Sequence, residues 1–429
     1  MRKRVLTFLT AMPLLLVCLV PLVPGEEWRV AVRQVTFGPK HHFFGYIGHV
    51  GTVPWNQSGR YIVALQTAFQ DHMPAPEDTA DIVLLDTQHD YAVRKVAETR
   101  AWNFQQGTML YWNPAAPETQ FLFNDRDPAT NQVFCVLFDM AAGPEGRRVR
   151  EYRDGDTPVG NSGVAQRGGY FAAINYGRLA RLRPVTGYPG ALDFTAGVAH
   201  PENDGVFRID VSSGEKRLLV SFRQLRDLVR PLRPDVDSME LFINHTLCNR
   251  QNDRIFFFVR GDFDTGHRLD IPLVVCPDGN GLTMLANHPG GHPDWDAGHR
   301  LIGQRGKEQV VYDTDRQAVV EVLGAAGVFP NPSGDTALSL DGRWLVNGQS
   351  QKNSNFYVFF CRSDGSHLRS PTIDKDHWKS GELRIDPAPC WNRDGTAVLA
   401  PGIAPDAAKT RQLFLVTPEY PTKHLERKS

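Results

Sequence analysis

A two-part motif recurs along the chain, and such a repeat constrains the fold more than any other feature of the sequence. Its first half is a short polar turn, often containing Asp-Gly or Gly-Arg, that leads into an apolar strand. Its second half is another apolar strand that ends in Asp or in a turn. The first half is clear at 55–65, 253–259, 341–348 and 391–400, and weaker at 112–123, 167–174 and 295–302. The second half begins at Asp81, Val133, Val206, Leu273, Gln309, Phe356 and Gln412.

Seven copies of each half give about 57 residues per unit, slightly more than a typical propeller repeat. We therefore expect an all-β fold, a seven-bladed β-propeller with long loops, in which radial repetition leaves only short sheet edges. The alternating segment that starts at Trp28 would close the ring by joining the last blade. One helix is predicted, around 221–229. The alternative fold is a stack of β-sandwiches, whose strands would be regularly spaced without the two-part motif.

The N-terminal segment has a different character from the repeats. Arg2, Lys3 and Arg4 precede an apolar run from Val5 to Val23, which is the layout of a secretory signal. We expect residues 1–25 to be a signal peptide or an uncleaved N-terminal anchor, and residues 26–429 to form a single propeller domain. The protein would then be secreted or periplasmic. No second apolar stretch of this length follows, which excludes a multi-span membrane protein.

Charge and cysteine content exclude further classes of protein. The 47 Lys and Arg residues nearly balance the 48 Asp and Glu residues, and a net charge of −1 provides no basic field to hold nucleic acid. The cysteines beyond the N-terminal segment are widely spaced and form no Cys-x-x-Cys pair. We interpret them as buried apolar residues rather than a disulfide framework or a zinc site. We expect a monomer with no nucleic-acid partner.

Polar residues stand just before the expected inner strands, and the inner strands of all blades of a propeller meet around one central channel. We interpret these residues as a candidate site. They are Asn103–Gln106, Asn175 with Arg178, Asn244 with His245, His288 with His292, Asn331 with Asp335, and Arg384 with Asp386. From this set and its aromatic neighbours we expect six substrate-binding residues, namely Trp102, Asn103, Gln106, Asn175, Tyr188 and Asn244.

Several of these motifs resemble a known family. The turns DGRW and NRDG before apolar strands are similar to TolB-type repeats, and TRAWNFQQGTMLYW, FINHTLCN and GGHPDW resemble the oligogalacturonate-lyase-like branch of those propellers. The resemblance implies a seven-bladed propeller with a divalent metal, Mn or Ca, held at its central face by histidines and a glutamine. A neighbouring histidine would be the base that removes a proton from a uronic acid unit. By position, His245 matches the base and His292 a metal ligand.

The sequence departs from the family pattern where those lyases place further histidines. This chain has Phe329–Pro332 and Arg384–Pro389 at the corresponding positions, so the matching residues do not assemble a histidine-rich cage. Two alternatives follow. The metal is held by a mixed set of His292, His245 and Asp386, or the protein has no metal.

The chemistry of these residue types leads to an acidic saccharide. β-Elimination from a uronate needs a neutralised carboxylate and a base within hydrogen-bond reach, and Arg178, Arg384 and His245 could supply both without a metal. Glycoside hydrolysis would need two carboxyl groups at a defined separation, and the inner-strand positions offer no clear pair. The main hypothesis is a secreted propeller that binds an acidic oligosaccharide or polysaccharide or acts on it as a lyase.

Each candidate residue also has a structural interpretation, so the question of catalysis stays open. His245 could be a core histidine, His292 could mark a strand entry, and Trp102 could be wedged between blades. The arginines of 178–183 could bind a carboxylate from a loop or lie in solvent. The alternative function is a non-catalytic, TolB-like propeller that binds a protein or a glycan at the cell surface.

Overall fold

Strands make up most of the part of the chain that the computed structural model describes, which is residues 29–45, 52–263, 265–286, 290–378 and 381–419. The predicted signal segment, residues 1–25, lies outside the described residues. Arg29–Glu419 forms one compact unit. Among the described residues, no helix has the length and apolar character needed to cross a bilayer.

Five sheets have four strands each, in which neighbouring strands are hydrogen-bonded and antiparallel. The first three are β2 (His41–Phe43), β3 (Tyr61–Thr67), β4 (Ala80–Asp86) and β5 (Ala92–Thr99); β6 (Tyr111–Trp112), β7 (Gln120–Arg126), β8 (Val133–Asp139) and β9 (Arg147–Tyr152); and β10 (Gly160–Val164), β11 (Tyr170–Ile174), β12 (Gly205–Asp210) and β13 (Lys216–Ser221). The other two are β14 (Phe242–Cys248), β15 (Ile255–Gly261), β16 (Leu269–Val275) and β17 (Thr283–Met284); and β27 (Cys390–Trp391), β28 (Val398–Ile403) and β29 (Arg411–Glu419) with β1 (Arg29–Gln34).

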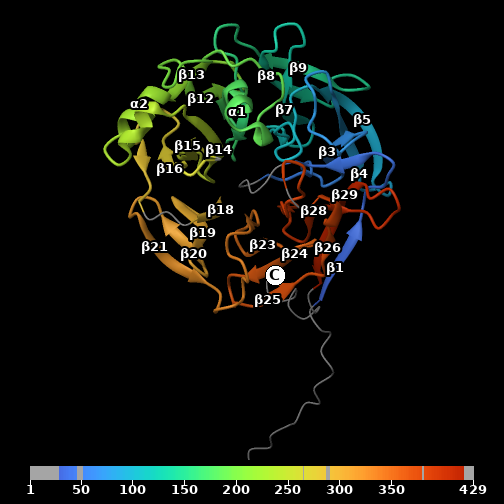
Figure 1. Cartoon of the computed structure of the whole chain (residues 1–429). Helices are drawn as coiled ribbons and strands as arrows, with labels where there is room; N and C mark the ends of the chain where they lie inside the picture. The colour runs from blue at the N-terminus through green and yellow to red at the C-terminus, as the bar shows by residue number, and fades with distance from the viewer. Residues whose placement is uncertain (1–28, 46–51, 264, 287–289, 379–380, 420–429) are drawn as a thin grey trace, which may run out of the picture. The chain divides into compact units, whose positions relative to one another are not determined.

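A sixth sheet has nine strands and consists of two antiparallel ladders. The first ladder holds β18 (Gly290–Trp295), β19 (Arg300–Arg305), β20 (Glu308–Asp313) and β21 (Ala318–Leu323), and the second holds β22 (Asp335–Leu338), β23 (Trp344–Ser350), β24 (Ser354–Cys361), β25 (His367–Arg369) and β26 (Ile373–Asp374). A single parallel pair, His292 with Asp335, joins the two ladders. Within Arg29–Glu419 the sheets follow one another in chain order around a common centre (Figure 1).

This arrangement confirms the predicted all-β propeller. Five blades are separate sheets, and the sixth sheet joins two ladders. The predicted number of seven blades is reached only if each of these two ladders is counted as a blade. The predicted closing strand is confirmed as well. The N-terminal strand β1 pairs with the C-terminal strand β29 from Arg29–Glu419 to Gln34–Phe414, so the two ends of the chain complete one blade.

The middle strands of the blades are apolar along almost their whole length because both of their faces are covered. In β8 and β28, for example, nearly every side chain is buried. The outer strand β9 alternates between exposed and part-buried residues, as a strand with one solvated face does. The core therefore lies between neighbouring blades. The second half of the sequence motif corresponds to the third strand of each blade.

Three inner strands carry a tryptophan that joins neighbouring blades. The indole N–H groups of Trp112, Trp295 and Trp391 donate to the main-chain oxygens of Pro54, Leu247 and Ala337, at 2.6, 2.8 and 3.0 Å. Each acceptor belongs to the inner part of the preceding blade. Each indole thus buries a large ring and satisfies its own polar group at the same time.

The helices differ in part from the expectation. The predicted helix is confirmed as α2 (Phe222–Val229), which Ser221 caps together with Gln224 in a capping box. A second helix, α1 (Tyr176–Leu182), stands where the sequence indicates a strand leading into a loop. Asn175 caps α1 by accepting a hydrogen bond from the backbone N–H of Arg178. Three short 3₁₀ helices complete the described elements, at Pro184–Thr186, Pro234–Ser238 and Asp376–Trp378.

We expect Trp391→Phe to lower the free energy of unfolding by about 2 kcal/mol, because it leaves the buried main-chain oxygen of Ala337 without its donor. Trp378→Phe is the matched control, since the indole N–H of Trp378 has no protein partner among the described residues. Chemical denaturation of both variants measures the difference. Equal losses of stability in the two variants would contradict a role for the indole hydrogen bond.

Candidate functional site

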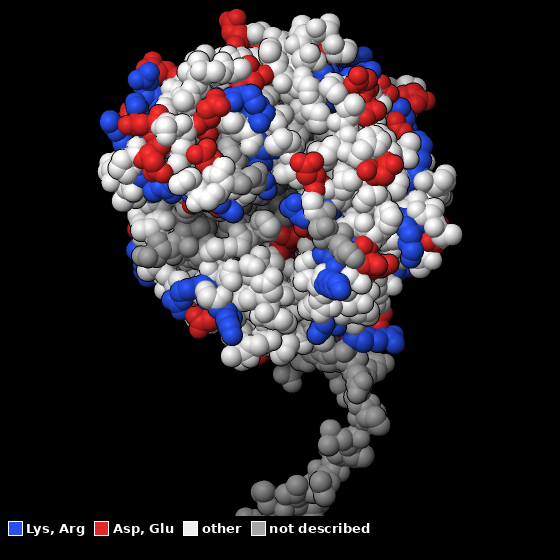
Figure 2. Space-filling view, viewed as in Figure 1, with Lys and Arg blue, Asp and Glu red and all other residues white. Residues whose placement is uncertain are grey.

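A cavity of about 290 Å³ opens among the loops and inner strands of several blades. Most of the side chains that line it are polar, and basic groups dominate. They are the arginines Arg183, Arg260, Arg268 and Arg384, the histidines His245 and His292, the amides Gln105, Gln106 and Asn244, and one carboxylate, Asp270. The face of the protein seen in Figure 2 is hollowed near its middle, where basic and acidic side chains meet.

His245 enters the cavity through an irregularity of β14. The pairing of β14 with β15 shifts register between Asn244 and Leu247, and His245 has a φ of 58°, in the left-handed region. A non-glycine residue there carries strain of the order of 1–3 kcal/mol, which the surrounding structure must offset. The Asn244 side chain holds the turn by accepting from the backbone N–H of His245 at 3.0 Å and from Gln106 Nε2 at 3.1 Å. Three predicted residues, Gln106, Asn244 and His245, thus come together.

His292 faces His245 across the cavity, with 5.9 Å between the ring centroids. Its Nδ1 lies 2.6 Å from Oδ1 of the buried Asp335, and the other oxygen of Asp335 accepts from the backbone N–H of Ala388 at 2.8 Å. Burial opposes a positive charge on His292, but the carboxylates of Asp335 and Asp386 outweigh it and raise the pKa of this histidine. The imidazole is therefore held in a fixed orientation by an acidic neighbour.

Arg384 and Asp386 precede β27 and form an ion pair beside the cavity. Arg384 Nε donates to Asp386 Oδ1 at 3.0 Å, and its Nη1 donates to the main-chain oxygen of Gly381. Burial and the nearby charge of Asp335 raise the pKa of Asp386, against the effect of Arg384. The Arg384 guanidinium lines the cavity, as expected of a group that would neutralise a ligand carboxylate.

The candidate metal ligands His292 and Asp386 each contact a charged neighbour. The Nδ1 atom of His292 lies 2.6 Å from Asp335, a contact that metal-ligating histidines often make with their other ring nitrogen, and one oxygen of Asp386 accepts from Arg384. Within the described ranges no group of three His, Cys, Asp or Glu side chains is arranged to hold a metal ion. The predicted metal stays a prediction, and we derive no chemical step through it.

The structure places Arg178 away from the cavity. It lies in α1, is almost completely buried, and has its guanidinium over the Phe222 ring at 4.5 Å. The guanidinium donates to the main-chain oxygens of Leu241, Val198 and Ala199. Because its donors are directed to protein oxygens, Arg178 serves to connect α1 to its surroundings rather than to bind a ligand carboxylate.

Four of the six expected substrate-binding residues also lie in the core. Trp102 packs against Phe43 and Phe104 and donates to the main-chain oxygen of Asp78. Asn103 donates to the main-chain oxygen of Gly187 and accepts from two backbone N–H groups of its own loop. Asn175 is the cap of α1, and Tyr188 stacks on Tyr176 at 4.2 Å between centroids. These side chains support the loops that line the cavity.

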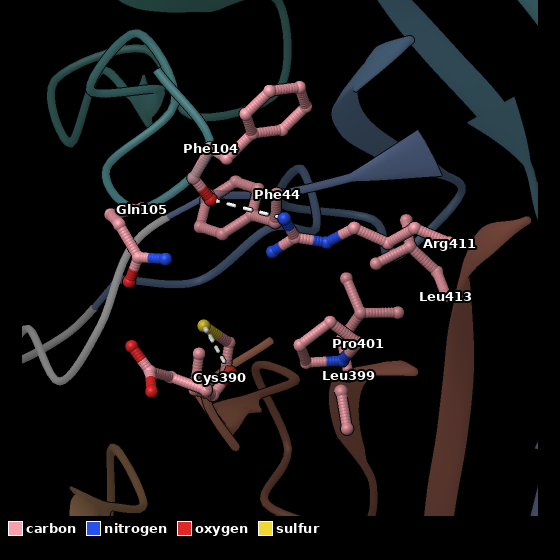
Figure 3. A pocket seen from close by; sticks show the side chains of 12 residues that line it. Phe44, Phe104, Gln105, Cys390, Leu399, Pro401, Arg411 and Leu413 are labelled. Carbon is pink, nitrogen blue, oxygen red and sulfur yellow. Dashed lines mark hydrogen bonds between the residues drawn. The ribbon is translucent and has the colours of Figure 1, made fainter. Parts of the chain in front are cut away.

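A second, much smaller cavity of about 20 Å³ lies near the first one, and Gln105 lines both. Figure 3 shows its lining, in which Arg411 extends from β29 toward Phe104 and Gln105. Arg411 donates to the main-chain oxygen of Phe104 at 3.2 Å, and burial lowers its pKa to about 10. This space admits a molecule the size of one water and is too small for a saccharide.

Sequence reasoning missed the basic residues of the β15–β16 hairpin. Arg260 and Asp270 are direct partners across this hairpin, and Phe263 and Arg268 lie in its loop. The residues before inner strands do not include this hairpin, which reaches the cavity from the two middle strands of a blade. An available signal was the charge of Arg260 and Asp270 at the ends of two otherwise apolar strands.

Comparisons with known proteins add structural likeness only. No family model matches the chain, and no curated protein matches it. Among solved structures, the β-propeller domain of Trilobed protease from Pyrococcus furiosus is similar with a TM-score of 0.45 and 12% identity, covering 88% of this chain and 99% of that one. TolB from Acinetobacter baumannii is similar with a TM-score of 0.36 and 10% identity, covering 92% of this chain and 97% of that one.

We expect Arg178→Gln to lower the free energy of unfolding by about 3 kcal/mol, because it leaves several buried main-chain oxygens without donors. Arg268→Gln, at a side chain that is 46% exposed, should change it by less than about 1 kcal/mol. Urea denaturation compares the two variants. A neutral effect of Arg178→Gln would show that its buried contacts do not stabilise the fold.

Proposed function

We propose that this propeller binds an anionic saccharide in the cavity of about 290 Å³, and that its main function is binding. The observation that supports the proposal is the environment of the Arg260 side chain. Its side chain is 11% exposed, and its guanidinium lies between the rings of Phe258 and Phe263, at 4.5 and 4.6 Å from their centroids. Nε donates to Asp270 Oδ1 at 2.8 Å, while the two terminal nitrogens have no protein partner among the described residues.

A buried guanidinium of this kind favours an acidic ligand. Burial lowers the pKa of Arg260, which means that the charged form is costly in its surroundings. An oxyanion that accepts from both terminal nitrogens would offset this cost with two charge-assisted hydrogen bonds. The two rings and Asp270 already fix the orientation of the fork, so little entropy is lost when the ligand binds.

The remaining lining suits a sugar better than a simple ion. The amides of Gln105 and Gln106 and the imidazoles of His245 and His292 supply donors and acceptors for hydroxyl groups. Arg384 adds a second positive charge from another blade. These features support an acidic oligosaccharide or polysaccharide as the ligand, and a cell-surface protein that carries such a glycan is compatible with the same cavity.

Further parts of the proposal concern the whole chain. We propose seven blades, because the nine-stranded sheet divides at the single pair His292–Asp335 into ladders of four and five strands, and β18–β21 and β22–β25 each repeat the four-stranded order of the other blades. We also propose that the protein is secreted or periplasmic, on the basis of the basic and apolar residues 1–25. We further propose that it is a monomer.

A second candidate function is β-elimination from a uronate bound in the same cavity. Its support is that His245 and Arg384 both line this space, with His292 beside His245. Arg384 would neutralise the carboxylate, and His245 would take the C5 proton as the C4–oxygen bond breaks, with the electron pair forming the C4–C5 double bond. Arg178 has no part in this scheme, because its guanidinium is buried elsewhere.

For the binding function, we expect Arg260→Gln to weaken the affinity for an acidic oligosaccharide by about tenfold or more, through loss of a charge-assisted bidentate contact. Arg343→Gln is the control, because Arg343 pairs with Asp341 on the surface and does not line the cavity. Isothermal titration with an oligogalacturonide and a neutral oligosaccharide of equal length measures both. Equal affinity for the acidic and neutral ligands would refute the proposal.

For the elimination function, we expect His245→Ala to abolish turnover while the affinity for the uronate changes by less than about threefold, since a base acts mainly in the transition state. The conjugated product absorbs in the ultraviolet, which gives a continuous assay. If the unsubstituted protein binds uronates and yields no such absorbance, the protein is a binding module.

A further inference from the structure

Three guanidinium groups surround a single aromatic ring at one end of the cavity. The guanidinium carbons of Arg268, Arg183 and Arg260 lie 3.6, 4.4 and 4.6 Å from the centroid of the Phe263 ring. All three arginines line the cavity. We call Phe263 with these arginines the Phe263 cluster. Contact at these distances orients each guanidinium on the ring.

The Phe263 cluster lies on the β14–β17 blade except for Arg183, which follows α1 of the β10–β13 blade. Phe263 meets Phe242 of β14 edge-on, with 6.2 Å between centroids, and Arg260 lies between Phe263 and Phe258. Asp270 receives hydrogen bonds from Arg260 Nε and from Arg268 Nη2. Asp270 therefore accepts from one nitrogen of each guanidinium and fixes their planes. A binding site requires this preorganisation.

Positive charge dominates this end of the cavity. Asp270 is the single carboxylate in the described lining, against the three arginines of the cluster. After burial and the opposing effect of Asp270, the charges of Arg268 and Arg183 lower the pKa of Arg260 further, which shows that the guanidiniums repel one another. A ligand group that contacts more than one of them would relieve this repulsion.

The shape of the anion follows from the number of guanidiniums. A carboxylate is planar and has two oxygens, so one arginine fork satisfies it. A sulfate or phosphate ester has three terminal oxygens on a tetrahedral centre and can accept from several guanidiniums in different directions. We infer that the Phe263 cluster binds the sulfate or phosphate ester group of a saccharide, an inference that rests on the proposed function and specifies its ligand.

The experiment uses four ligands that differ at one position of the sugar: glucose 6-sulfate, glucose 6-phosphate, glucuronate and glucose. We expect the full chain to bind at least one of the two esters about tenfold more tightly than glucuronate, and glucose not measurably, in isothermal titration at low salt. The comparison of sulfate with phosphate decides which ester is the natural one. Chondroitin and chondroitin sulfate provide the same comparison on a polymer.

Two variants separate the cluster from general charge. Arg268→Gln should remove most of the preference for the ester and leave glucuronate binding within about twofold, because Arg260 still provides its fork. Arg260→Gln should weaken both ligands. Arg343→Gln, outside the cavity, should change neither. Circular dichroism and thermal denaturation establish that each variant is folded.

The outcomes distinguish this inference from the proposed function. Glucuronate binding as tightly as both esters would overturn the inference and leave the proposed function in place. Ester binding that Arg268→Gln does not weaken would likewise overturn it, since the anion would then lie elsewhere. If neither these ligands nor the acidic oligosaccharides and polymers bind, the proposed function fails together with the inference.

Discussion

The contact between neighbouring inner strands is the interaction on which the rest of the structure depends. An isolated four-stranded sheet with two apolar faces is not stable in water, so every blade needs a neighbour on each side. The indole N–H groups of Trp112, Trp295 and Trp391 fix this packing where the blades come closest. The pairing of β1 with β29 then closes the ring, because one blade contains strands from both ends of the described unit.

Once the ring is closed, small local irregularities decide which side chains reach the cavity. The register shift in β14 turns His245 toward His292, at the cost of a left-handed backbone conformation. Asn244 and Gln106, from different blades, bond to each other directly behind it. The strained histidine is thus supported by an inter-blade hydrogen bond, so its position depends on the same packing that holds the blades together.

Much of the fold follows from the sequence because repeat, turn and strand agree at every copy. Asp-Gly and Asn-Arg turns before apolar strands fix where strands begin, and the covered faces of the blades explain their continuous apolar character. The position in the repeat also identified Gln106, Asn244, His245, His292 and Arg384 as residues of one cavity. Inner-strand ends meet in any propeller, so this part of the site needs no knowledge of loops.

The rest could not be read from position in the repeat. Helix α1 contains Gly177, where a side chain would collide with the main chain of Leu192. This close packing of α1 also buries Arg178. The approach of Phe263 and Arg268 to the cavity depends on the length and path of the β15–β16 loop, a tertiary property that has no periodic signal.

The chemistry of the cavity favours ligand binding as its main function, because ion pairs hold its charged side chains in fixed orientations. Asp270 orients Arg260 and Arg268, Asp386 orients Arg384, and Asp335 orients His292. A basic group held in this way gains affinity for an anion without having to move. Elimination also needs a base whose nitrogen reaches the substrate proton. His245 is the side chain that would act as this base. Catalysis by this propeller therefore depends on one imidazole, whereas anion binding depends on several arginines from different blades.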